Sequence, residues 1–336
     1  FHVTGVQTCA LPIYLPMGIG VQGIADVYNI FKYPWDSEDA YQLNKQIFEH
    51  MYYACIDESK ELAKKYGHYE SFPDSPFSKG QLQWHMWNVD IKDLSPNLDW
   101  GKLIEEVKQY GTRNSLLTAL MPTASTAQIM GNYEGFEPYR KMLFVRTTLA
   151  GEFIVFNEYL IRDLKELGLW NSDMRKLIII NDGSIQDIPE IPENIKAIYK
   201  TAFEIPLKSI IKQSIDRAPF VDQSQSLNLF LNKPDFKMLA SAHFYGWKSG
   251  LKTGMYYLHS NPAVNPINFG IDIDDIKRLK KISSLTDMIN YGLDKTKNSP
   301  EQSPQNSPNN SASSSPVMMC KWIPGRKAEG CEMCSS

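Results

Sequence analysis

Short apolar runs alternate with helical patterns along this chain, and that alternation limits the possible folds more than any other feature. "RNSLLTALMP" is a mainly apolar run that ends at Pro122, so it predicts a strand, and "STAQIMGN" after it predicts the start of a helix. "SQSLNLFL" and "TGMYYLHS" predict two further strands, and "KLIIIND" around Ile178–Ile180 predicts a buried one. Strands separated by helices are typical of an α/β fold with parallel strands.

The longest helical pattern extends from Asp36 to Lys65. Either Asp36 or Ser37 can cap its start, and Gly67 ends it. Its apolar residues recur at helical spacing and predict one buried face, made of Tyr41, Ile47, Phe48, Met51, Ala54, Cys55 and Leu62. "SPNLDWGKLIEEVKQYG" predicts a second helix that stops at Gly111. Further helices are expected at 157–167, 195–215 and 234–239.

The two ends of the chain differ from the part between them. Residues 1–15, which include Cys9, lack the features of a signal peptide and do not fit the pattern that follows, so we interpret them as foreign to the domain. Residues 16–290 are expected to form the domain. Residues 291–336 are rich in Ser, Asn and Pro and almost free of aromatic residues, which predicts a disordered tail.

Charge and cysteine content exclude several classes of protein. The formal net charge is −3, so no bulk field attracts nucleic acid or an anionic membrane. No apolar run approaches the roughly 18 residues that span a bilayer. The 5 cysteines are irregularly spaced, which argues against a secreted disulfide framework and favours a reducing, cytoplasmic setting. The histidines lack the spacing of a zinc site.

A glycine-rich motif near the start of the domain invites a nucleotide-binding interpretation that the context does not support. "GIGVQG" at Gly18–Gly23 matches the dinucleotide fingerprint G-x-G-x-x-G. That fingerprint also needs a preceding strand and an acidic residue about 20 residues further on. The upstream sequence is the foreign segment, and the acids at Asp36–Asp39 fall in a helix start. We therefore predict a tight turn at a strand–helix junction.

The segment "MPTASTAQ" has two possible roles. Thr123, Ala124, Ser125 and Thr126 follow a predicted strand and open a helix, where free N–H groups and the helix dipole can hold a phosphate. Alternatively, Thr123 or Ser125 simply caps the helix. The residues alone favour capping, because the Gly-rich loop and the lysine of a P-loop are absent.

Two paired motifs suggest redox chemistry. Tyr256 and Tyr257 are adjacent in a predicted strand, where an ordinary pair buries one ring and exposes the other; the alternative is one-electron oxidation of the phenols. Cys331 and Cys334 form a C-x-x-C pair at the end of the tail, which is typical of a thiol–disulfide couple. About 35 flexible residues span roughly 30–35 Å, so the pair can reach a disulfide on its own protein or on a bound neighbour.

Several long stretches resemble the large, catalytic subunit of class I ribonucleotide reductase of the eukaryotic and viral type. The resemblance extends from about Pro16 to Leu279 and resumes at the terminal "CEMC". It is carried by "GIGVQGIADVY", "RNSLLTALMPTASTAQIMGN", "NDGSIQDIPEIP", "IDRAPFVDQSQSLNLF" and "HFYGWKSGLKTGMYYLHSNPAVNPI". It implies the C-terminal part of a ten-stranded α/β barrel. The parent enzyme reduces ribonucleoside diphosphates to deoxyribonucleotides for DNA replication, by thiyl-radical chemistry.

The resemblance also implies roles for particular residues. Pro122, Thr123, Ala124, Ser125 and Thr126 would hold the substrate phosphates at a helix N-terminus, in place of simple capping. The tyrosine pair would carry a radical inward from the small subunit, which houses a diiron–tyrosyl radical, with Tyr257 nearer that subunit and Tyr256 nearer the thiyl cysteine. The Cys331/Cys334 dithiol would re-reduce an active-site disulfide and be recharged by thioredoxin or glutaredoxin.

Other parts of the family's machinery have no counterpart in this sequence. The thiyl cysteine, the two reducing cysteines and the ATP and dNTP effector sites belong upstream, and neither Cys9 nor Cys55 matches them. We therefore expect this chain to bind no cofactor of its own and to be inactive alone. The implied partners are the small subunit and a second large subunit. Two alternatives remain: a non-catalytic module that binds the small subunit, and a redox sensor carried by the tail.

Overall fold

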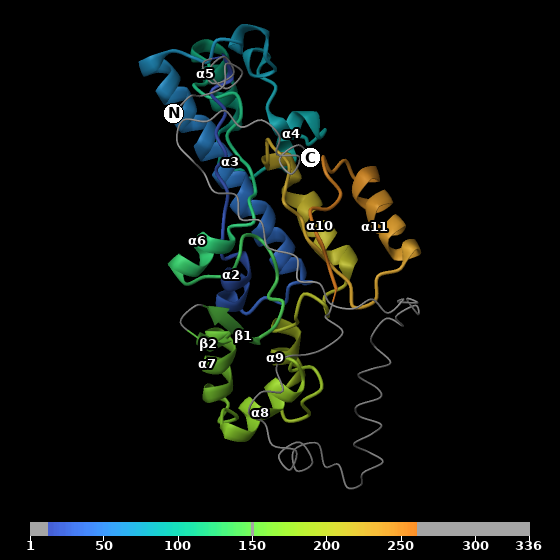
Figure 1. The fold of residues 1–336 in the computed structure, drawn as a ribbon. Helices are drawn as coiled ribbons and strands as arrows, with labels where there is room; N and C mark the ends of the chain where they lie inside the picture. The colour runs from blue at the N-terminus through green and yellow to red at the C-terminus, as the bar shows by residue number, and fades with distance from the viewer. Residues whose placement is uncertain (1–12, 149–150, 261–336) are drawn as a thin grey trace, which may run out of the picture. The chain divides into compact units, whose positions relative to one another are not determined.

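The computed structural model describes residues 13–148 and 151–260, where helices outnumber strands (Figure 1). The helices are α2 (Ile24–Phe31), α3 (Glu38–Tyr66), α4 (Gln83–Met86), α5 (Trp100–Tyr110), α6 (Ala124–Met130), α7 (Glu158–Glu166), α8 (Ser172–Ile180), α9 (Glu193–Ile198), α10 (Leu207–Arg217) and α11 (Phe236–Lys248). The strands are β1 (Leu143–Thr148), β2 (Gly151–Phe156), β3 (Leu229–Phe230) and β4 (Leu258–His259).

The ends of α3 confirm the predicted start and stop. Ser37 is the N-cap, and its side chain accepts a hydrogen bond from the backbone N–H of Ala40 at 3.2 Å. Gly67 closes the helix with a φ of 81°, a conformation that glycine adopts without the steric cost of a Cβ. Asp36 does not cap the helix; its carboxylate pairs with Lys200 at 2.8 Å.

The buried face of α3 differs in part from the predicted apolar face. Phe48 is fully buried, whereas Ala54 is exposed and the other predicted residues are partly buried. Besides Ala40, Tyr52, Ile56 and Ala63, the buried face of α3 contains four polar residues: Asn44, Glu49, Ser59 and Lys60. Each makes hydrogen bonds, as in the case of Glu49, which accepts from Ser95 N–H and Trp100 Nε1–H at 2.6 and 3.2 Å. A pattern of apolar residues alone could not predict this polar contribution, because it depends on distant partners.

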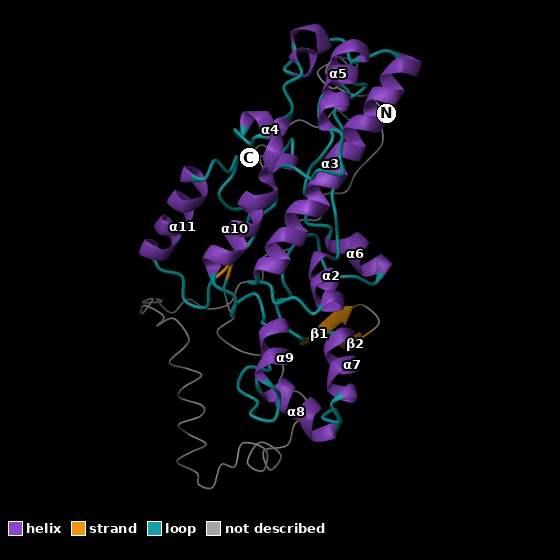
Figure 2. Ribbon diagram, turned by 180° about the vertical axis from the view of Figure 1, so that it is seen from behind, coloured by secondary structure: helices purple, strands orange, loops and turns teal. Residues whose placement is uncertain are grey.

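Parallel pairing confirms the α/β class, although the strands are short. Ile19 pairs with Thr118, Leu120 with Gln225, and β3 with β4, all in parallel. β3, α11 and β4 form a β–α–β unit, in which the helix provides the crossover that parallel strands require (Figure 2). The pairings order four extended segments side by side. Within the described residues these segments do not close into a barrel.

Two predictions about local structure are wrong. The apolar run at Ile178–Ile180 is the end of α8 and not a strand, because Asn171 caps a helix start by accepting from Met174 N–H at 2.8 Å. The helix expected at 195–215 is two helices, α9 and α10, since Tyr199 ends the first and Pro206 caps the second. The structure also contains an antiparallel hairpin, β1–β2, that the sequence analysis did not predict.

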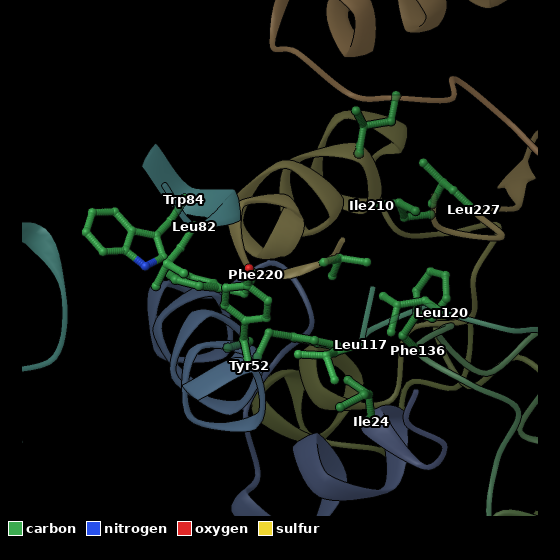
Figure 3. Packing of buried hydrophobic residues seen from close by; sticks show 14 of the residues in the cluster. Ile24, Tyr52, Leu82, Trp84, Leu117, Leu120, Phe136, Ile210, Phe220 and Leu227 are labelled. Carbon is green, nitrogen blue, oxygen red and sulfur yellow. The ribbon is translucent and has the colours of Figure 1, made fainter. Parts of the chain in front are cut away.

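The main hydrophobic core collects side chains from α2, α3, α10 and the extended segments (Figure 3). Ile24, Tyr52, Leu117, Phe220 and Leu227 all belong to it. A second cluster joins α7, α8 and α9. Full burial of one such side chain contributes about 1.5–3 kcal/mol, so each shared contact holds the extended segments firmly against the helices.

One buried arginine anchors the extended segment that leads into β3. Arg217, at the end of α10, is 1% exposed and lies over the ring of Phe136. Its guanidinium donates to Gln225 Oε1 at 2.7 Å, Asn44 Oδ1 at 3.0 Å and Ser214 Oγ at 2.8 Å. Burial lowers the pKa of Arg217 to about 10, which leaves it charged near neutral pH. A buried charge with these partners fixes the segment at Gln225, two residues before Leu227.

Candidate functional site

The start of α6 presents backbone N–H groups that nothing caps. Thr123 stands at the N-cap position with a φ of 54°, in the left-handed region, and makes no side-chain cap bond. Its hydroxyl instead accepts from Gly135 N–H at 2.7 Å. Within the described part of the chain, the N–H groups of Ala124, Ser125 and Thr126 donate no hydrogen bond. The capping interpretation is therefore wrong for both candidates: the Thr123 hydroxyl binds Gly135 N–H, and Ser125, inside α6, accepts from none of these N–H groups.

The glycine motif at Gly18–Gly23 lies beside the extended segment that leads into α6. Gly23 has a φ of 82° and precedes α2, while Ile19 pairs with Thr118, so the predicted tight turn at a strand–helix junction is confirmed. A Cβ at Gly20 would clash with the carbonyl oxygen of Ala119, which explains glycine at that position. Gln22 Oε1 accepts from the hydroxyl of Thr126 at 3.1 Å. The motif therefore packs against the strand that leads into α6.

The two adjacent tyrosines do not alternate across a strand. Tyr256 is 51% exposed and Tyr257 is 57% exposed, and their ring centroids lie 4.4 Å apart at an interplanar angle of 63°. The expectation of one buried and one exposed ring is therefore wrong. Interaction with the Tyr257 hydroxyl is the main cause that raises the pKa of Tyr256. The structure brings two oxidisable phenols into contact at the surface.

Backbone hydrogen bonds hold the tyrosine pair beside β3. Leu229 N–H donates to the carbonyl oxygen of Tyr257 at 2.9 Å, and Tyr256 N–H donates to the carbonyl oxygen of Leu227 at 2.6 Å. His259, two residues further on, stacks on the ring of Phe230 with centroids 5.2 Å apart. Burial lowers the pKa of His259, and nearby Arg140 lowers it further. This histidine is therefore neutral near pH 7.

A buried amide and a buried carboxyl lie behind the tyrosine pair. Asn228 accepts from Tyr257 N–H at 3.1 Å through Oδ1 and donates to Glu137 through Nδ2. Glu137 is 6% exposed, and its Oε2 lies 3.5 Å from the Arg140 guanidinium. Burial raises the pKa of Glu137 to about 7, although Arg140 opposes the shift. Sequence reasoning missed both residues, because nothing in "SQSLNLFL" or "GFEPY" marks a polar side chain as buried.

Exposed aromatic side chains gather on α11, next to the loop that leads to the tyrosines. Phe236, Phe244 and Trp247 are 85%, 68% and 73% exposed. A Cβ at Gly254 would come within 2.6 Å of the His243 ring, so the loop follows α11 closely. α10 and α11 lie side by side (Figure 1). The high exposure of these aromatic residues shows that α10 does not cover them. Large exposed apolar residues grouped in this way commonly mark a protein–protein contact.

A cavity of about 620 Å³ lies elsewhere in the described residues. Its lining includes Tyr52, Tyr69, Phe77, Met86 and Asp222, and none of the predicted site residues. Asp222 accepts from the N–H groups of Leu117 and Thr118 at 2.7 and 3.2 Å, so its carboxylate fixes the extended segment before α6. We assign this cavity no part in the predicted chemistry.

The predicted redox cysteines cannot be placed. Cys331 and Cys334 lie outside the described residues, as does Cys9. Cys55 is a free, partly buried thiol on α3, and burial raises its pKa, which agrees with the core role predicted for it. Within residues 13–148 and 151–260, His, Cys, Asp and Glu side chains form no group of three or more that could hold a metal ion. No helix in that same part of the chain has the length and apolar content to cross a membrane.

Comparison with known proteins gives a consistent answer. The family model described as ribonucleotide reductase, barrel domain, matches residues 13–257. The ribonucleoside-diphosphate reductase large subunit of Acanthamoeba polyphaga mimivirus is 54% identical over 265 residues, which are 79% of this chain and 30% of that protein. The large subunit of Danio rerio is 49% identical over 272 residues, 81% of this chain and 34% of that protein.

A solved structure supports the same relationship. The class Id ribonucleotide reductase alpha subunit of Actinobacillus ureae matches with a TM-score of 0.58 at 25% identity, covering 74% of this chain and 40% of that one. The chain thus spans about a third of the length of the curated relatives it matches. Because the family model covers most of the domain and the relatives are about half identical, the chain belongs to the family of ribonucleotide reductase large subunits.

Proposed function

We propose that this chain is part of a ribonucleoside-diphosphate reductase large subunit that converts ribonucleoside diphosphates to 2′-deoxyribonucleoside diphosphates. One observation carries the proposal: two phenol rings are in contact, and both are exposed, at the start of β4. An ordinary strand would separate them. In a family whose relatives are named ribonucleoside-diphosphate reductase, a surface pair of oxidisable side chains fits the entry of a radical from a partner.

Each turnover is a two-electron reduction of the ribose. The C2′–O bond breaks and the oxygen leaves as water, while a cysteine pair gives two electrons and two protons and becomes a disulfide. The initiating thiyl radical would form on a cysteine upstream of this sequence, after transfer through Tyr257 and then Tyr256. We expect the oxidising equivalent to come from the small subunit, where a diiron–tyrosyl centre would provide it.

The open start of α6 would hold the substrate phosphates. Ala124, Ser125 and Thr126 present three N–H groups without other partners in the described residues, at the positive end of a helix dipole. Thr123 adopts a strained backbone conformation there, of the kind that concentrates at ligand-binding sites. Because these three N–H groups have no protein acceptor in the described residues, a phosphate would displace no existing hydrogen bond by binding to them.

The tail dithiol would restore the reductant. One thiolate of the Cys331/Cys334 pair attacks the active-site disulfide to give a mixed disulfide, and the second thiol resolves it. The tail then carries the disulfide and the active site is reduced. Thioredoxin or glutaredoxin reduces the tail again. This chemistry needs a reducing compartment, so a cytoplasmic location belongs to the proposal.

Replacing Tyr257 with Phe tests the proposal in the full-length large subunit combined with its small subunit. Turnover should fall by at least about 10³-fold, or about 4 kcal/mol of barrier, because a phenyl ring is far harder to oxidise than a phenol. Binding of nucleoside diphosphate should not change. Tyr66→Phe is the matched control, since Tyr66 is 58% exposed on α3 and should tolerate the change. Retained turnover in Tyr257→Phe would refute the radical role.

The surface around α11 also allows a non-catalytic module that binds the small subunit through its exposed aromatic residues. That function predicts that Tyr257→Phe changes nothing measurable, whereas Trp247→Ala weakens the complex.

The dithiol has its own test. Replacing both Cys331 and Cys334 with Ser should stop thioredoxin-driven turnover but allow about one round with pre-reduced enzyme. Repeated rounds in this variant would contradict the shuttle, and unaffected deoxynucleotide formation in Cys331→Ser would favour a redox sensor.

A further inference from the structure

Two consecutive backbone N–H groups at the start of β4 point at the same neighbouring segment. Tyr256 N–H donates to the Leu227 carbonyl oxygen at 2.6 Å, and Tyr257 N–H donates to the Asn228 side chain at 3.1 Å. Along a regular strand, successive N–H groups point in opposite directions. The backbone is therefore irregular here, with a bend at Tyr256 just before β4, and the Tyr257 N–H group needs an acceptor that the strand pairing does not supply.

This irregularity explains why both rings share one side. Side chains of neighbouring residues face opposite sides of a regular strand. Here the centroids of Tyr256 and Tyr257 are 4.4 Å apart, and both side chains are about half exposed. The side-chain oxygen of Asn228 satisfies the extra donor, so it removes the cost of an unpaired N–H group in this conformation. The geometry of the pair thus depends on a side chain from the adjacent strand segment.

Glu137 determines the orientation of that side chain. Asn228 is 4% exposed, and its amide has one accepting end and one donating end. Because Nδ2 donates to Glu137 Oε1, Oδ1 faces Tyr257 N–H. Glu137 accepts this bond both as a carboxylate and as a carboxylic acid. Without an acceptor at this position, a rotated amide would present NH₂ to the Tyr257 N–H group, and the two donors would repel.

The charged and polar groups around Glu137 are Arg140, Glu134 and the Tyr133 hydroxyl. Arg140 lies 3.5 Å from Glu137 and 3.7 Å from Glu134, and its backbone N–H donates to the Tyr133 hydroxyl at 2.9 Å. Asn228 accepts from the Tyr257 backbone N–H, Glu137 accepts from Asn228, and within the described residues neither side chain has a hydrogen bond to the Tyr256 or Tyr257 hydroxyl. They can act on the tyrosines only through position.

We propose that Asn228 and Glu137 are positioning residues that hold Tyr256 and Tyr257 in contact for radical transfer. The role of these residues in radical transfer rests on the proposed function. The tether, which is the hydrogen bond from Tyr257 N–H to Asn228 Oδ1, does not depend on it. Asn228 supplies the acceptor for the Tyr257 N–H group, and Glu137 keeps the amide correctly oriented.

Asn228→Ala in the full-length large subunit tests the tether by hydrogen–deuterium exchange and by turnover with the small subunit. The Tyr257 amide should exchange about tenfold faster, and kcat should fall at least about tenfold while KM for the nucleoside diphosphate stays the same. Asn114→Ala is the matched control. Asn114 is also buried, at 6% exposed, and its Nδ2 donates to Leu15 O at 2.9 Å, away from the pair. It should leave Tyr257 exchange unchanged.

Two substitutions at Glu137 provide a second test that does not require Asn228→Ala to fold. Glu137→Gln keeps an oxygen acceptor and should preserve Tyr257 exchange and kcat within about twofold. Glu137→Leu removes the acceptor and should reproduce the effects of Asn228→Ala in weaker form. If Glu137 acts by positioning Asn228, the Tyr257 exchange rate and kcat should stay near their wild-type values in Glu137→Gln but not in Glu137→Leu.

The outcomes separate this inference from the proposed function. Unchanged Tyr257 exchange in both Asn228→Ala and Glu137→Leu would overturn the tether, whatever Tyr257→Phe shows. Faster exchange with unchanged kcat would overturn its role in radical transfer. If Tyr257→Phe kept full activity, the proposed function would fail, whereas the exchange measurements would still report on the tether.

Discussion

The start of α6 and the start of β4 show two different ways to prepare a site. At α6, three N–H groups are left without partners in the described residues, and the hydroxyl of Thr123, at the N-cap position, accepts from Gly135 N–H instead. At β4, by contrast, every backbone donor of the tyrosine pair is engaged, one of them by a buried side chain. The first arrangement leaves capacity for a ligand. The second restricts two side chains whose contact the proposed radical transfer requires.

One short segment serves both places. Gly135 N–H binds the Thr123 hydroxyl at 2.7 Å, and Glu137, two residues later, accepts from Asn228. Asp26, on α2, fixes the same segment by accepting from Tyr133 N–H at 2.6 Å and from the Tyr139 hydroxyl. One segment therefore supports both places: the start of α6, called here the open site because its N–H groups lack partners in the described residues, and the Tyr256/Tyr257 pair, called here the braced site because its backbone donors are engaged. Substitutions that affect only one of them will show how independent they are.

The largest effect is expected at the braced site, from Tyr256→Phe. Loss of the phenol should lower kcat of the full-length subunit by about 10³-fold, because radical transfer loses a step that phenylalanine cannot replace. KM for the nucleoside diphosphate should be unchanged, since the α6 start is untouched. Steady-state kinetics with the small subunit measure both quantities. A large rise in KM would show that the two sites are not separate.

Ala124→Val, at the open site, should change KM and leave kcat nearly unchanged, which is the opposite of the effect expected for Tyr256→Phe. A branched side chain on the first residue of α6 crowds the approach of a phosphate to the backbone N–H groups, so KM should rise about tenfold, or about 1.4 kcal/mol, with kcat nearly unchanged. Equilibrium binding of the nucleoside diphosphate would check the rise. Ala54→Val, at an exposed alanine of α3, is the matched control. Equal affinity in the two variants would count against a phosphate at α6.

Glu137→Gln tests the shared segment through the pH dependence of stability. Burial raises the pKa of Glu137 to about 7 from 4.5, so the folded protein keeps a proton that the unfolded chain releases. Its contribution to stability is complete below pH 4.5 and is lost as the pH rises through 7. The wild type should lose about 2 kcal/mol relative to Glu137→Gln between pH 5.5 and pH 7. Denaturation midpoints at the two pH values measure this, and parallel profiles would rule it out.

Thr123→Val should have the smallest effect. It keeps the shape of the side chain and removes the hydroxyl that accepts from Gly135 N–H, which lies in a buried position. The unpaired donor should cost about 1 kcal/mol of unfolding free energy and raise KM a few-fold. Thr123→Ser keeps the hydroxyl and should retain both values. Equal behaviour of Val and Ser would show that the link between the segment and α6 is unimportant.

Sequence patterns predicted the elements whose signals are local. Ser37 and Gly67 marked the ends of α3, and the Gly18–Gly23 turn was placed correctly between an extended segment and α2. The prediction at Ile178–Ile180 failed because an apolar run fits a buried strand and a buried helix end equally well. The cap that decides between them, Asn171, stands well upstream of the run.

The candidate site could be located from the sequence only in part. The resemblance carried by "PTAST" and "GMYY" predicted two segments, whose roles stay predictions, and the comparisons confirm the family. Whether Thr123 caps α6 depends on Gly135, and whether the tyrosines alternate depends on Asn228 and Glu137. These partners are distant in sequence, and a polar residue carries no local signal of its burial.

Residue order was sufficient for the α/β class, the two ends of α3 and the family, because periodicity, caps and long matching motifs are properties of neighbouring residues. The exposure of both tyrosines, the uncapped start of α6 and the raised pKa of Glu137 became defined only when separate segments packed together. Each depends on a hydrogen bond or on burial between residues far apart in the chain, and the free energy of those contacts exists only in the folded state.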